Sequence, residues 1–232
     1  MKYNPQIHHR RSIRLKGYDY AQAGLYFITL CCQDRSHLFG HIHNNKMILN
    51  EYGEIAQTEW LKTEQIRKNC RIHEFIIMPN HIHGIIEIIF KIGGENEIGK
   101  FQSPSQTIGA IIRGYKITTI KKIKDLIQEK ENKEEERKRD RKEEKKGEKR
   151  NKEDRKGKST GELQFAPTAP TAPTAPTESA PTALTQKIKS LDFKIWQRNY
   201  YEIIIRNEIA YNRISEYIIN NPKKWDKDTL KL

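Results

Sequence analysis

A low-complexity stretch in the second half of this 232-residue chain limits the folds open to it. Residues 124–158 are almost entirely charged, and residues 166–184 repeat proline in the pattern APTAPTAPT. A segment without an apolar stripe has no face to bury, so it forms at most a solvated helix, and a proline-paced repeat stays extended. We therefore predict one domain in two parts, residues 1–123 and 186–232, interrupted by a disordered insertion at residues 124–185.

Both parts of the predicted domain carry strand and helix patterns. Apolar and β-branched runs mark the strands, and apolar faces at helical spacing mark the helices. A short hairpin is predicted within residues 42–50, around Asn44 and Asn45. The order strand, helix, strand, strand, helix, strand, helix predicts an α+β fold, a ferredoxin-like antiparallel sheet with helices. The predicted strands are residues 24–34, 71–78, 81–90 and 200–207, and the predicted helices are residues 51–66, 105–123 and 208–221. Trp60 is predicted to pack inward, and Asn207 to cap the last helix.

The chain is strongly basic, with 43 Lys and Arg residues against 30 Asp and Glu residues, a net charge of +13 and a pI near 9.5. This surplus favours a polyanionic partner, most simply nucleic acid, although charge does not separate DNA from RNA or from a membrane surface. The three cysteines form no CxxC pair, which argues against a disulfide framework and indicates a reducing cytoplasm. We expect a soluble intracellular protein, because the sequence has neither a signal peptide nor a run of about 18 apolar residues.

The run FIIMPNHIHGIIEIIF, residues 75–90, places two histidines inside a predicted strand. Side chains on a strand alternate between its faces, so His81 and His83 share one face while Ile82 and Ile86 point to the core. The two Cα atoms are then about 7 Å apart, near enough for both imidazoles to bind one divalent cation. The alternative is that both are polar side chains on a half-solvated face. The HExxH pattern of zinc hydrolases is absent.

The predicted last helix aligns a tyrosine with an asparagine. Tyr217 and Asn221 share one stripe with Ala210 and Ile214, so they are neighbours one turn apart. The amide oxygen of Asn221 is therefore a candidate third metal ligand, with the phenol of Tyr217 beside it. The alternatives from spacing alone are a core aromatic residue at position 217 and a helix-ending residue at position 221.

Five segments of the chain together resemble the REP-associated tyrosine transposases. This bacterial family belongs to the single-tyrosine HUH endonucleases, where HUH stands for His, a hydrophobic residue and His. The resemblance covers residues 5–122 and 186–228, in the order in which the family carries its motifs, and it implies the HUH endonuclease fold. The segments are RRSIRLKGYDYAQAGLYFITLCCQDR, IIMPNHIHGII, IGAIIRGYK, IWQRNYYEIIIRNE and EYIINNPKKW.

The resemblance implies a role for each residue that matches a family motif. His81 and His83 match the histidines that hold a divalent cation, Mg²⁺ or Mn²⁺, and Asn221 matches the position of a further metal ligand. Tyr217 matches the nucleophile. Six basic residues are candidate contacts to DNA phosphates: Arg10, Arg11, Arg14, Lys16, Arg113 and Lys116.

The activity implied by the resemblance is the nicking and rejoining of single-stranded DNA, especially hairpin or REP-like sequences. Attack by Tyr217 would leave a 5′-phosphotyrosine and a free 3′-hydroxyl, and rejoining would need no ATP because the adduct retains the bond energy. Related enzymes exchange the tyrosine helix between subunits, and the insertion would permit such a homodimer here. The implied location is the cytoplasm, with the nucleoid, and no membrane partner is expected.

Two other functions fit the same residues. One is a hairpin-binding protein that keeps the fold and the basic surface but does not cut. The other is a metal-dependent phosphodiesterase that uses water and would tolerate Tyr217→Phe. Tyr200 and Tyr201 are rival nucleophiles, but they begin a predicted strand and lack an amide partner one turn away, so packing is the role expected of them.

Overall fold

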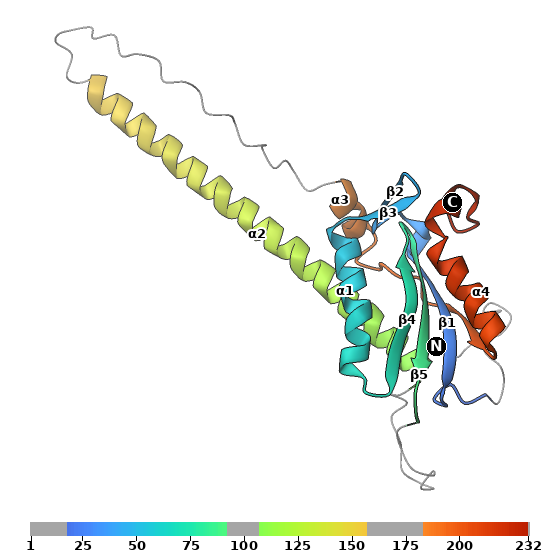
Figure 1. The fold of residues 1–232 in the computed structure, drawn as a ribbon. Coiled ribbons are helices and arrows are strands. Elements are labelled where there is room, and N and C mark those ends of the chain that lie inside the picture. Colours follow the sequence, from blue (N-terminus) through green and yellow to red (C-terminus); the bar gives the residue numbers. More distant parts are fainter. Residues whose placement is uncertain (1–17, 92–106, 157–182, 232) are drawn as a thin grey trace, which may run out of the picture. The chain divides into compact units, whose positions relative to one another are not determined.

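The structure is a computed structural model and describes residues 18–91, 107–156 and 183–231 (Figure 1). The proline-paced repeat lies outside the described residues, as do four of the candidate phosphate contacts, namely Arg10, Arg11, Arg14 and Lys16. The helices and strands that carry the other predicted site residues are all described.

The chain forms two compact units. The first comprises Met1–Ile123 with Ile188–Leu232, and the second comprises Lys124–Lys187. Helix α2 (Ile108–Lys156) begins in the first unit and runs into the second, and α3 (Ala183–Ser190) begins in the second. The first unit carries the HxH strand, so the fold that positions the candidate site is described for that unit.

The first unit is built on a four-stranded antiparallel sheet with the strand order β4-β5-β1-β6. Its strands are β1 (Gly24–Cys31), β4 (Cys70–Ile77), β5 (His81–Ile88) and β6 (Tyr201–Ile205). Helix α1 (Glu51–Ile66) follows β1 before β4, and helices α2 and α3 follow β5 before β6. This order of elements confirms the predicted α+β, ferredoxin-like class.

A separate two-stranded hairpin pairs β2 (Gly40–His43) with β3 (Lys46–Leu49). Asn44 and Asn45 form its two-residue turn with φ values of 49° and 59°. Asparagine tolerates this left-handed conformation, and two such residues make the turn that suits the twist of a hairpin. The predicted hairpin around these asparagines is confirmed.

Helix α1 (Glu51–Ile66) and the first part of α2 cover one face of the sheet. The side chain of Asn50 caps α1 by accepting hydrogen bonds from the backbone N–H groups of Tyr52 and Gly53. The Trp60 ring lies edge-on to Tyr115 of α2 at 5.1 Å, and the Tyr115 hydroxyl donates to the Ala56 carbonyl. The predicted inward packing of Trp60 is therefore confirmed, and the two helices form one layer.

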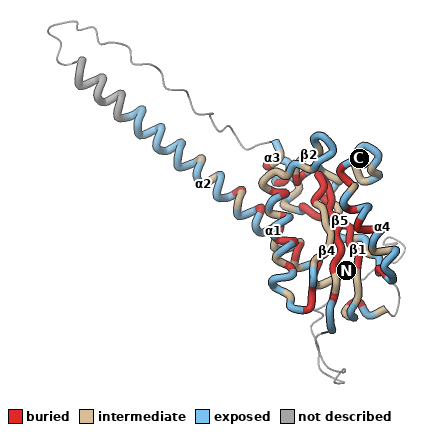
Figure 2. Tube along the Cα trace, in the orientation of Figure 1, coloured by how far each residue is buried: buried red, intermediate tan, exposed pale blue. Residues whose placement is uncertain are grey.

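Helix α4 (Glu208–Ile219) lies across the sheet from α1 (Figure 1). Asn207 caps it, as predicted, by accepting a hydrogen bond from the backbone N–H of Ala210 at 2.8 Å. An apolar cluster joins this helix to the sheet, so β5 is covered on both sides and its residues are almost all buried (Figure 2). The cluster consists of Phe27, Ile85, Ile205, Ile214 and Ile218.

Several predicted boundaries differ from the structure; β5 ends at Ile88 rather than residue 90, and α2 continues to Lys156, past its predicted end at residue 123. The first strand ends at Cys31 rather than residue 34, because the short 3₁₀ helix η1 (Gln33–Arg35) follows, and Asp34 has a φ of 52° that no strand accommodates. Helix α2 begins at Ile108, and the Thr107 hydroxyl accepts a hydrogen bond from the N–H of Ala110. The start predicted at residue 105 lies outside the described residues.

The charged part of α2 is the solvated helix that the sequence allowed. Its described side chains beyond residue 132 are almost all exposed (Figure 2). Lys138 pairs with Glu134 at 3.3 Å and Arg139 with Glu135 at 3.8 Å, each one turn apart on the helix. Exposed pairs of this kind contribute only about 0.3–0.5 kcal/mol each, so they stabilise this part of α2 only slightly.

Gly84→Ala is expected to destabilise the first unit by about 1–3 kcal/mol, because the sheet and α1 meet closely at this position. A Cβ atom there would lie 2.6 Å from Trp60 Cζ2 and 3.0 Å from Phe75 Cβ. Urea denaturation measures the loss, and Gly114→Ala is the matched control because its nearest contact is the flexible Arg67 guanidinium at 3.3 Å. Equal losses in the two variants would show that the contact with Trp60 does not matter.

Candidate metal centre

Strand β5 presents His81 and His83 on the face that α4 covers. Their side chains are 0% and 2% exposed, and their ring centroids lie 4.5 Å apart. The alternation of side chains along the strand puts both imidazoles on one face, as the sequence analysis predicted. Their burial rules out the alternative of polar side chains on a half-solvated face.

The tautomer of His81 is set by its neighbour Asn80. The Asn80 amide nitrogen donates to the carbonyls of Leu230 at 2.6 Å and Arg35 at 3.2 Å, which turns the amide oxygen toward His81. That oxygen lies 2.7 Å from His81 Nδ1, so Nδ1 carries the proton. The lone pair of Nε2 is then available, and Nε2 has no hydrogen-bond partner among the described residues. Metal-binding histidines are oriented in this way.

His83 is oriented by a threonine on the neighbouring strand. Its Nδ1 atom lies 2.8 Å from the Thr29 hydroxyl, which can accept the Nδ1 proton. Its Nε2 atom lies 3.1 Å from the hydroxyl of Tyr217, so the phenol donates to it. The Phe27 ring stacks on the imidazole at 5.4 Å and fixes its plane.

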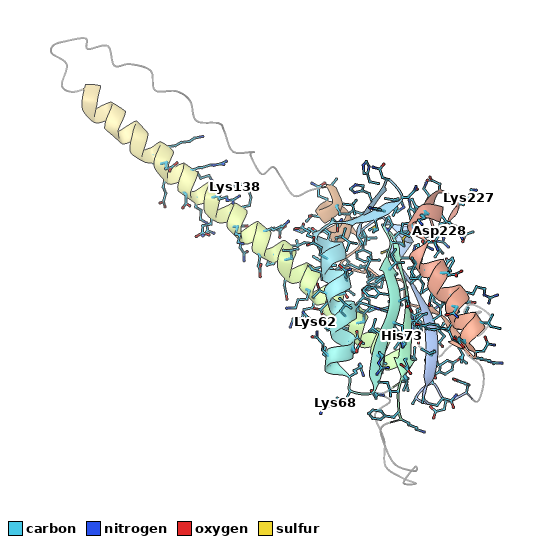
Figure 3. All side chains as sticks on the ribbon, in the orientation of Figure 1. Lys62, Lys68, His73, Lys138, Lys227 and Asp228 are labelled. Carbon is cyan, nitrogen blue, oxygen red and sulfur yellow. The ribbon has the colours of Figure 1, made fainter. Side chains whose placement is uncertain are left out.

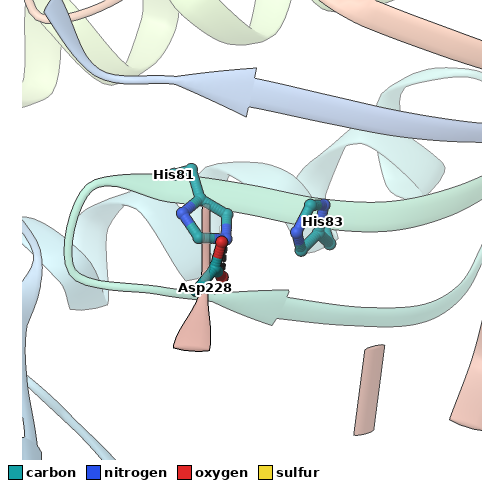
Figure 4. Close-up of side chains that lie close together, drawn as sticks. All are labelled: His81, His83 and Asp228. Atoms are coloured by element: carbon teal, nitrogen blue, oxygen red, sulfur yellow. Dashed lines mark ion pairs between the residues drawn. The ribbon is translucent and has the colours of Figure 1, made fainter. Parts of the chain in front are cut away.

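A third candidate ligand, Asp228, comes from the C-terminal segment and was missed by the sequence analysis. It follows the 3₁₀ helix η2 (Pro222–Lys227), and its Oδ1 atom accepts a hydrogen bond from the Leu230 N–H at 2.7 Å (Figure 3). Its Oδ2 atom lies 3.7 Å from His81 Nε2 (Figure 4). The ligand atoms of His81, His83 and Asp228 all lie within 4.8 Å of one another, so this cluster could hold a metal ion.

Asn221, the predicted third ligand, lies at the same site. It is 2% exposed and stands just past α4, before Pro222 opens η2. Burial raises the pKa of Tyr217 and Asn221 partly offsets this rise, so the Asn221 side chain lies near the phenol. The amide oxygen has no hydrogen-bond partner among the described residues.

The donor atoms present fit a bound cation. Three of them are buried without a hydrogen-bond partner in the described part of the chain: His81 Nε2, Asn221 Oδ1 and Asp228 Oδ2. A buried polar atom left unpaired costs free energy, and two of these atoms, His81 Nε2 and Asp228 Oδ2, lie 3.7 Å apart, as expected where an ion or ligand binds. Two imidazoles with carboxylate and amide oxygens are ligands that divalent cations accept.

Tyr217 projects from α4 beside this cluster. It is 39% exposed, and its ring lies 5.1 Å from the His83 ring and edge-on to Phe27 at 6.2 Å. Burial raises its pKa, the Asp228 carboxylate raises it further, and Asn221 partly offsets both. The phenol is therefore protonated at neutral pH.

Hydrogen bonds to β4 hold α4 in register with the sheet. The Tyr211 hydroxyl donates to Glu74 Oε2 at 2.8 Å, and the Ser215 hydroxyl donates to the same oxygen at 3.2 Å. These bonds and the apolar cluster fix the helix that carries Tyr217. Tyr211 itself contacts His73, away from the HxH pair.

A pocket of about 480 Å³ opens beside Tyr217 and His83. Thr29 and Tyr201 line it from β1 and β6, and Thr229 lines it from the C-terminal segment. The pocket gives a ligand access to the Tyr217 hydroxyl, while His81 stays buried behind it.

The two described candidate phosphate contacts lie on α2, in the layer that covers the other face of the sheet. Lys116 donates to the carbonyls of Gln197 at 2.7 Å, Asn199 at 3.3 Å and Arg198 at 3.4 Å, so it holds the segment before β6. Burial lowers the pKa of Lys116 to about 8. Arg113 is exposed, and its part in DNA binding stays a prediction.

Metal-free protein is expected to lose stability as the pH falls from 6.5 toward 3. Burial is the main cause that lowers the pKa of both His81 and His83 to about 3, whereas histidine in an unfolded chain titrates near pH 6.5. Between these values the unfolded chain binds more protons, so the free energy of unfolding falls by up to about 1.4 kcal/mol per pH unit for each histidine.

Urea denaturation in EDTA at a series of pH values measures this effect. A variant with both His81→Gln and His83→Gln is expected to show a flatter profile over the same range. His41→Gln, at an exposed position of β2, is the control. The explanation fails if the double variant and the wild type lose stability in parallel.

Every helix in the described part of the chain is too short or too polar to cross a bilayer.

Comparison with known proteins gives one strong match. An uncharacterized protein of Haemophilus influenzae is 36% identical over 237 residues, which cover 99% of this chain and 97% of that protein. No family model matches the chain. A solved structure of a REP-associated tyrosine transposase bound to a REP hairpin aligns with a TM-score of 0.43 and 15% identity, over 91% of this chain and 74% of that chain.

Proposed function

We propose that this chain, which belongs to the same family as the Haemophilus influenzae protein, is a transposase-type endonuclease that nicks and rejoins single-stranded DNA through Tyr217. One observation carries the proposal. The Tyr217 hydroxyl stands at an open pocket, 3.1 Å from His83 Nε2 and beside buried atoms that could hold a metal. A nucleophile needs this combination of access and nearby charge stabilisation.

In the proposed step, the Tyr217 hydroxyl oxygen attacks the phosphorus of one phosphodiester. A bond forms between this oxygen and phosphorus while the bond from phosphorus to the 3′ oxygen breaks. The phenol gives up its proton, and the leaving 3′ oxygen gains one. The products are a 5′-phosphotyrosine and a free 3′-hydroxyl, and reversal by a second 3′-hydroxyl rejoins DNA without ATP.

Residues of the chain orient the phenol for this attack. The Asn221 side chain lies near the phenol, and the packing of Phe27 against the ring limits its rotation. His83 Nε2 can serve only one partner at a time, so the phenol would give up its contact with His83 in the metal-bound state. The raised pKa of Tyr217 means that its proton must be removed during attack.

We further propose that His81, His83 and Asp228 hold a divalent cation, Mg²⁺ or Mn²⁺, with the Asn221 amide oxygen as a fourth ligand. The unpaired buried atoms of His81, Asn221 and Asp228 support this set. When bound, the cation polarises the scissile phosphate and stabilises charge on its oxygens. Oxygen ligands beside the imidazoles suit hard cations of this kind.

Single-stranded DNA with hairpin or REP-like sequences is the proposed substrate, which places the protein with the nucleoid in the cytoplasm. The net charge of +13 supports a polyanionic partner. A phosphate must reach a hydroxyl that lies between α4 and the sheet, and an unpaired strand bends into such a site more readily than a regular duplex. We also propose that a homodimer can form by exchange of α4 between subunits.

The products of one reaction separate this function from its alternatives. End-labelled hairpin DNA from the flanks of the gene is incubated with protein and Mg²⁺, Mn²⁺ or EDTA, and resolved on a denaturing gel. We expect one fragment with a 3′-hydroxyl that a polymerase extends, and one fragment that stays linked to protein until protease treatment. A free 5′-phosphate fragment would instead indicate a phosphodiesterase that uses water, and bound but intact DNA would indicate a hairpin-binding protein.

A further inference from the structure

Several residues that line the pocket beside Tyr217 have no role in the proposed chemistry. Besides Tyr217 and His83, the lining of this pocket includes Gln197, Asn199, Tyr200 and Tyr201. Its volume of about 480 Å³ lies within the range of about 300–1,000 Å³ that is usual for small-ligand sites. The lining combines an aromatic ring with two amides, which is a chemistry suited to a heterocyclic ligand.

The register of the sheet fixes where Tyr201 stands relative to the candidate metal centre. Thr29 pairs with His83 on one side and with Tyr201 on the other. Residues paired directly across antiparallel strands point to the same face, so the three side chains form one row on the α4 face. Adjacent strands lie about 4.8 Å apart, which puts the Cα atoms of Tyr201 and His83 about 10 Å apart. A nucleotide spans such a distance between its phosphate and its base.

The Tyr201 ring is open to solvent at this position. Helix α4 packs over Phe27, Ile85 and Ile205, the last residue of β6, and leaves the start of β6 on the same face exposed. Tyr201 is consequently 51% exposed, and Ile203, the next residue of β6 on this face, is 38% exposed. The packing role expected for Tyr201 from the sequence does not account for a ring that is half exposed beside a pocket.

The segment that leads into Tyr201 is held from the α2 side by a half-buried lysine. Lys116 donates to the carbonyls of Gln197 at 2.7 Å and Asn199 at 3.3 Å. Its ammonium also lies 5.8 Å from the centre of the Tyr200 ring. Lys116 therefore engages Tyr200 and fixes the backbone that carries the two amides, which leaves Tyr201 as the exposed ring of the pair.

We propose that Tyr201 stacks an unpaired nucleobase next to the phosphate that Tyr217 attacks, and that the Gln197 and Asn199 amides contact the edge of this base. Aromatic rings stack on any base, and amides can donate to and accept from base edges, so the ring supplies affinity and the amides supply selectivity. Tyr201 acts as a binding residue and takes no part in bond making. The inference rests on the proposed function for the identity of the substrate.

An abasic scan tests this inference without requiring cleavage. Hairpin DNA from the flanks of the gene is prepared with a single abasic site at each unpaired position in turn, and binding is measured by fluorescence anisotropy with the Tyr217→Phe protein. We expect one position at which loss of the base weakens binding by about ten-fold. Adding Tyr201→Ala should weaken binding of intact DNA by a similar factor and remove the penalty at that position.

Two further variants separate stacking from general damage. Adding Tyr201→Phe should keep the abasic penalty because the ring remains, and adding Ile203→Ala, at a neighbouring exposed position of β6, should keep it as well. If the penalties are unchanged by Tyr201→Ala, the inference is overturned, even where wild-type protein cleaves DNA. If the loss of binding at the abasic position depends on Tyr201 while wild-type protein never cleaves DNA, the base-binding site is supported and the proposed cleavage is contradicted.

Discussion

Tyr217→Phe is expected to eliminate the covalent adduct between protein and DNA and to slow strand cleavage by a factor of about 10⁴ or more, as loss of a nucleophile does in enzymes that use one. The substitution removes only the hydroxyl that lies 3.1 Å from His83 Nε2. The ring and its edge-on contact with Phe27 remain, so fold and DNA binding should persist. Denaturing electrophoresis of labelled DNA in Mg²⁺ or Mn²⁺ measures the adduct.

Tyr211→Phe is the matched control for this variant. Tyr211 lies on the same helix and loses a hydroxyl that contacts Glu74 and His73 rather than the HxH pair. The Ser215 bond to Glu74 and the apolar cluster still hold α4 in this variant, so it should form the adduct at close to the wild-type level. Cleavage that persists in Tyr217→Phe, with free 5′-phosphate products, would contradict the tyrosine mechanism and favour attack by water.

Asp228→Asn is expected to weaken Mn²⁺ binding by about 100-fold or more and to reduce cleavage in parallel. Loss of a residue that only orients a metal ligand already lowers metal affinity by about 10- to 100-fold, and loss of a ligand itself should lower it at least as much. The Oδ2 atom of Asp228 lies 3.7 Å from His81 Nε2 and has no hydrogen-bond partner among the described residues. The asparagine keeps the shape of the side chain and removes its charge. Isothermal titration calorimetry with Mn²⁺ measures the affinity directly, apart from any DNA.

Asp226→Asn controls for the loss of a negative charge in the same segment. The Asp226 carboxylate is 90% exposed and pairs with Lys231, so its loss should leave Mn²⁺ affinity unchanged. Asn221→Ala, measured in the same way, reports on the ligand predicted from the sequence. If Asn221→Ala abolishes Mn²⁺ binding and Asp228→Asn does not, the metal is held by the histidines and the amide, and Asp228 is not a ligand.

Local patterns in the sequence were sufficient for most of the fold. The apolar runs of β1 and β5, the Asn207 cap of α4 and the paired asparagines of the hairpin each act within a few residues, so their structure follows from neighbouring positions. β1 was predicted to extend to residue 34 but ends at Cys31, because the pattern of apolar residues does not reveal the left-handed backbone of Asp34. The long α2 helix was predicted only in its apolar first part, since its remainder is all charge.

The sequence predicted the candidate site only where two of its residues lie on the same strand or helix, at the spacing that puts both side chains on one face. The alternation of a strand places His81 beside His83, and the turn of a helix places Tyr217 beside Asn221. Asp228 reaches the site because the chain folds back after η2, and no spacing in the sequence signals that contact. The same holds for Asn80, whose amide is fixed by carbonyls far along the chain, at Leu230 and Arg35. Contacts between distant segments set both the third ligand and the histidine tautomer.

The central claim is that Tyr217 becomes bonded to DNA, and peptide mapping tests it most directly. Wild-type protein is incubated with single-stranded hairpin DNA and Mn²⁺, the DNA is trimmed with nuclease, and tryptic peptides are analysed by mass spectrometry. We predict a nucleotide adduct on the peptide of residues 214–223, at Tyr217, that is absent in EDTA. DNA cleaved while this peptide stays unmodified, or an adduct at Tyr200 or Tyr201 instead, would contradict the account.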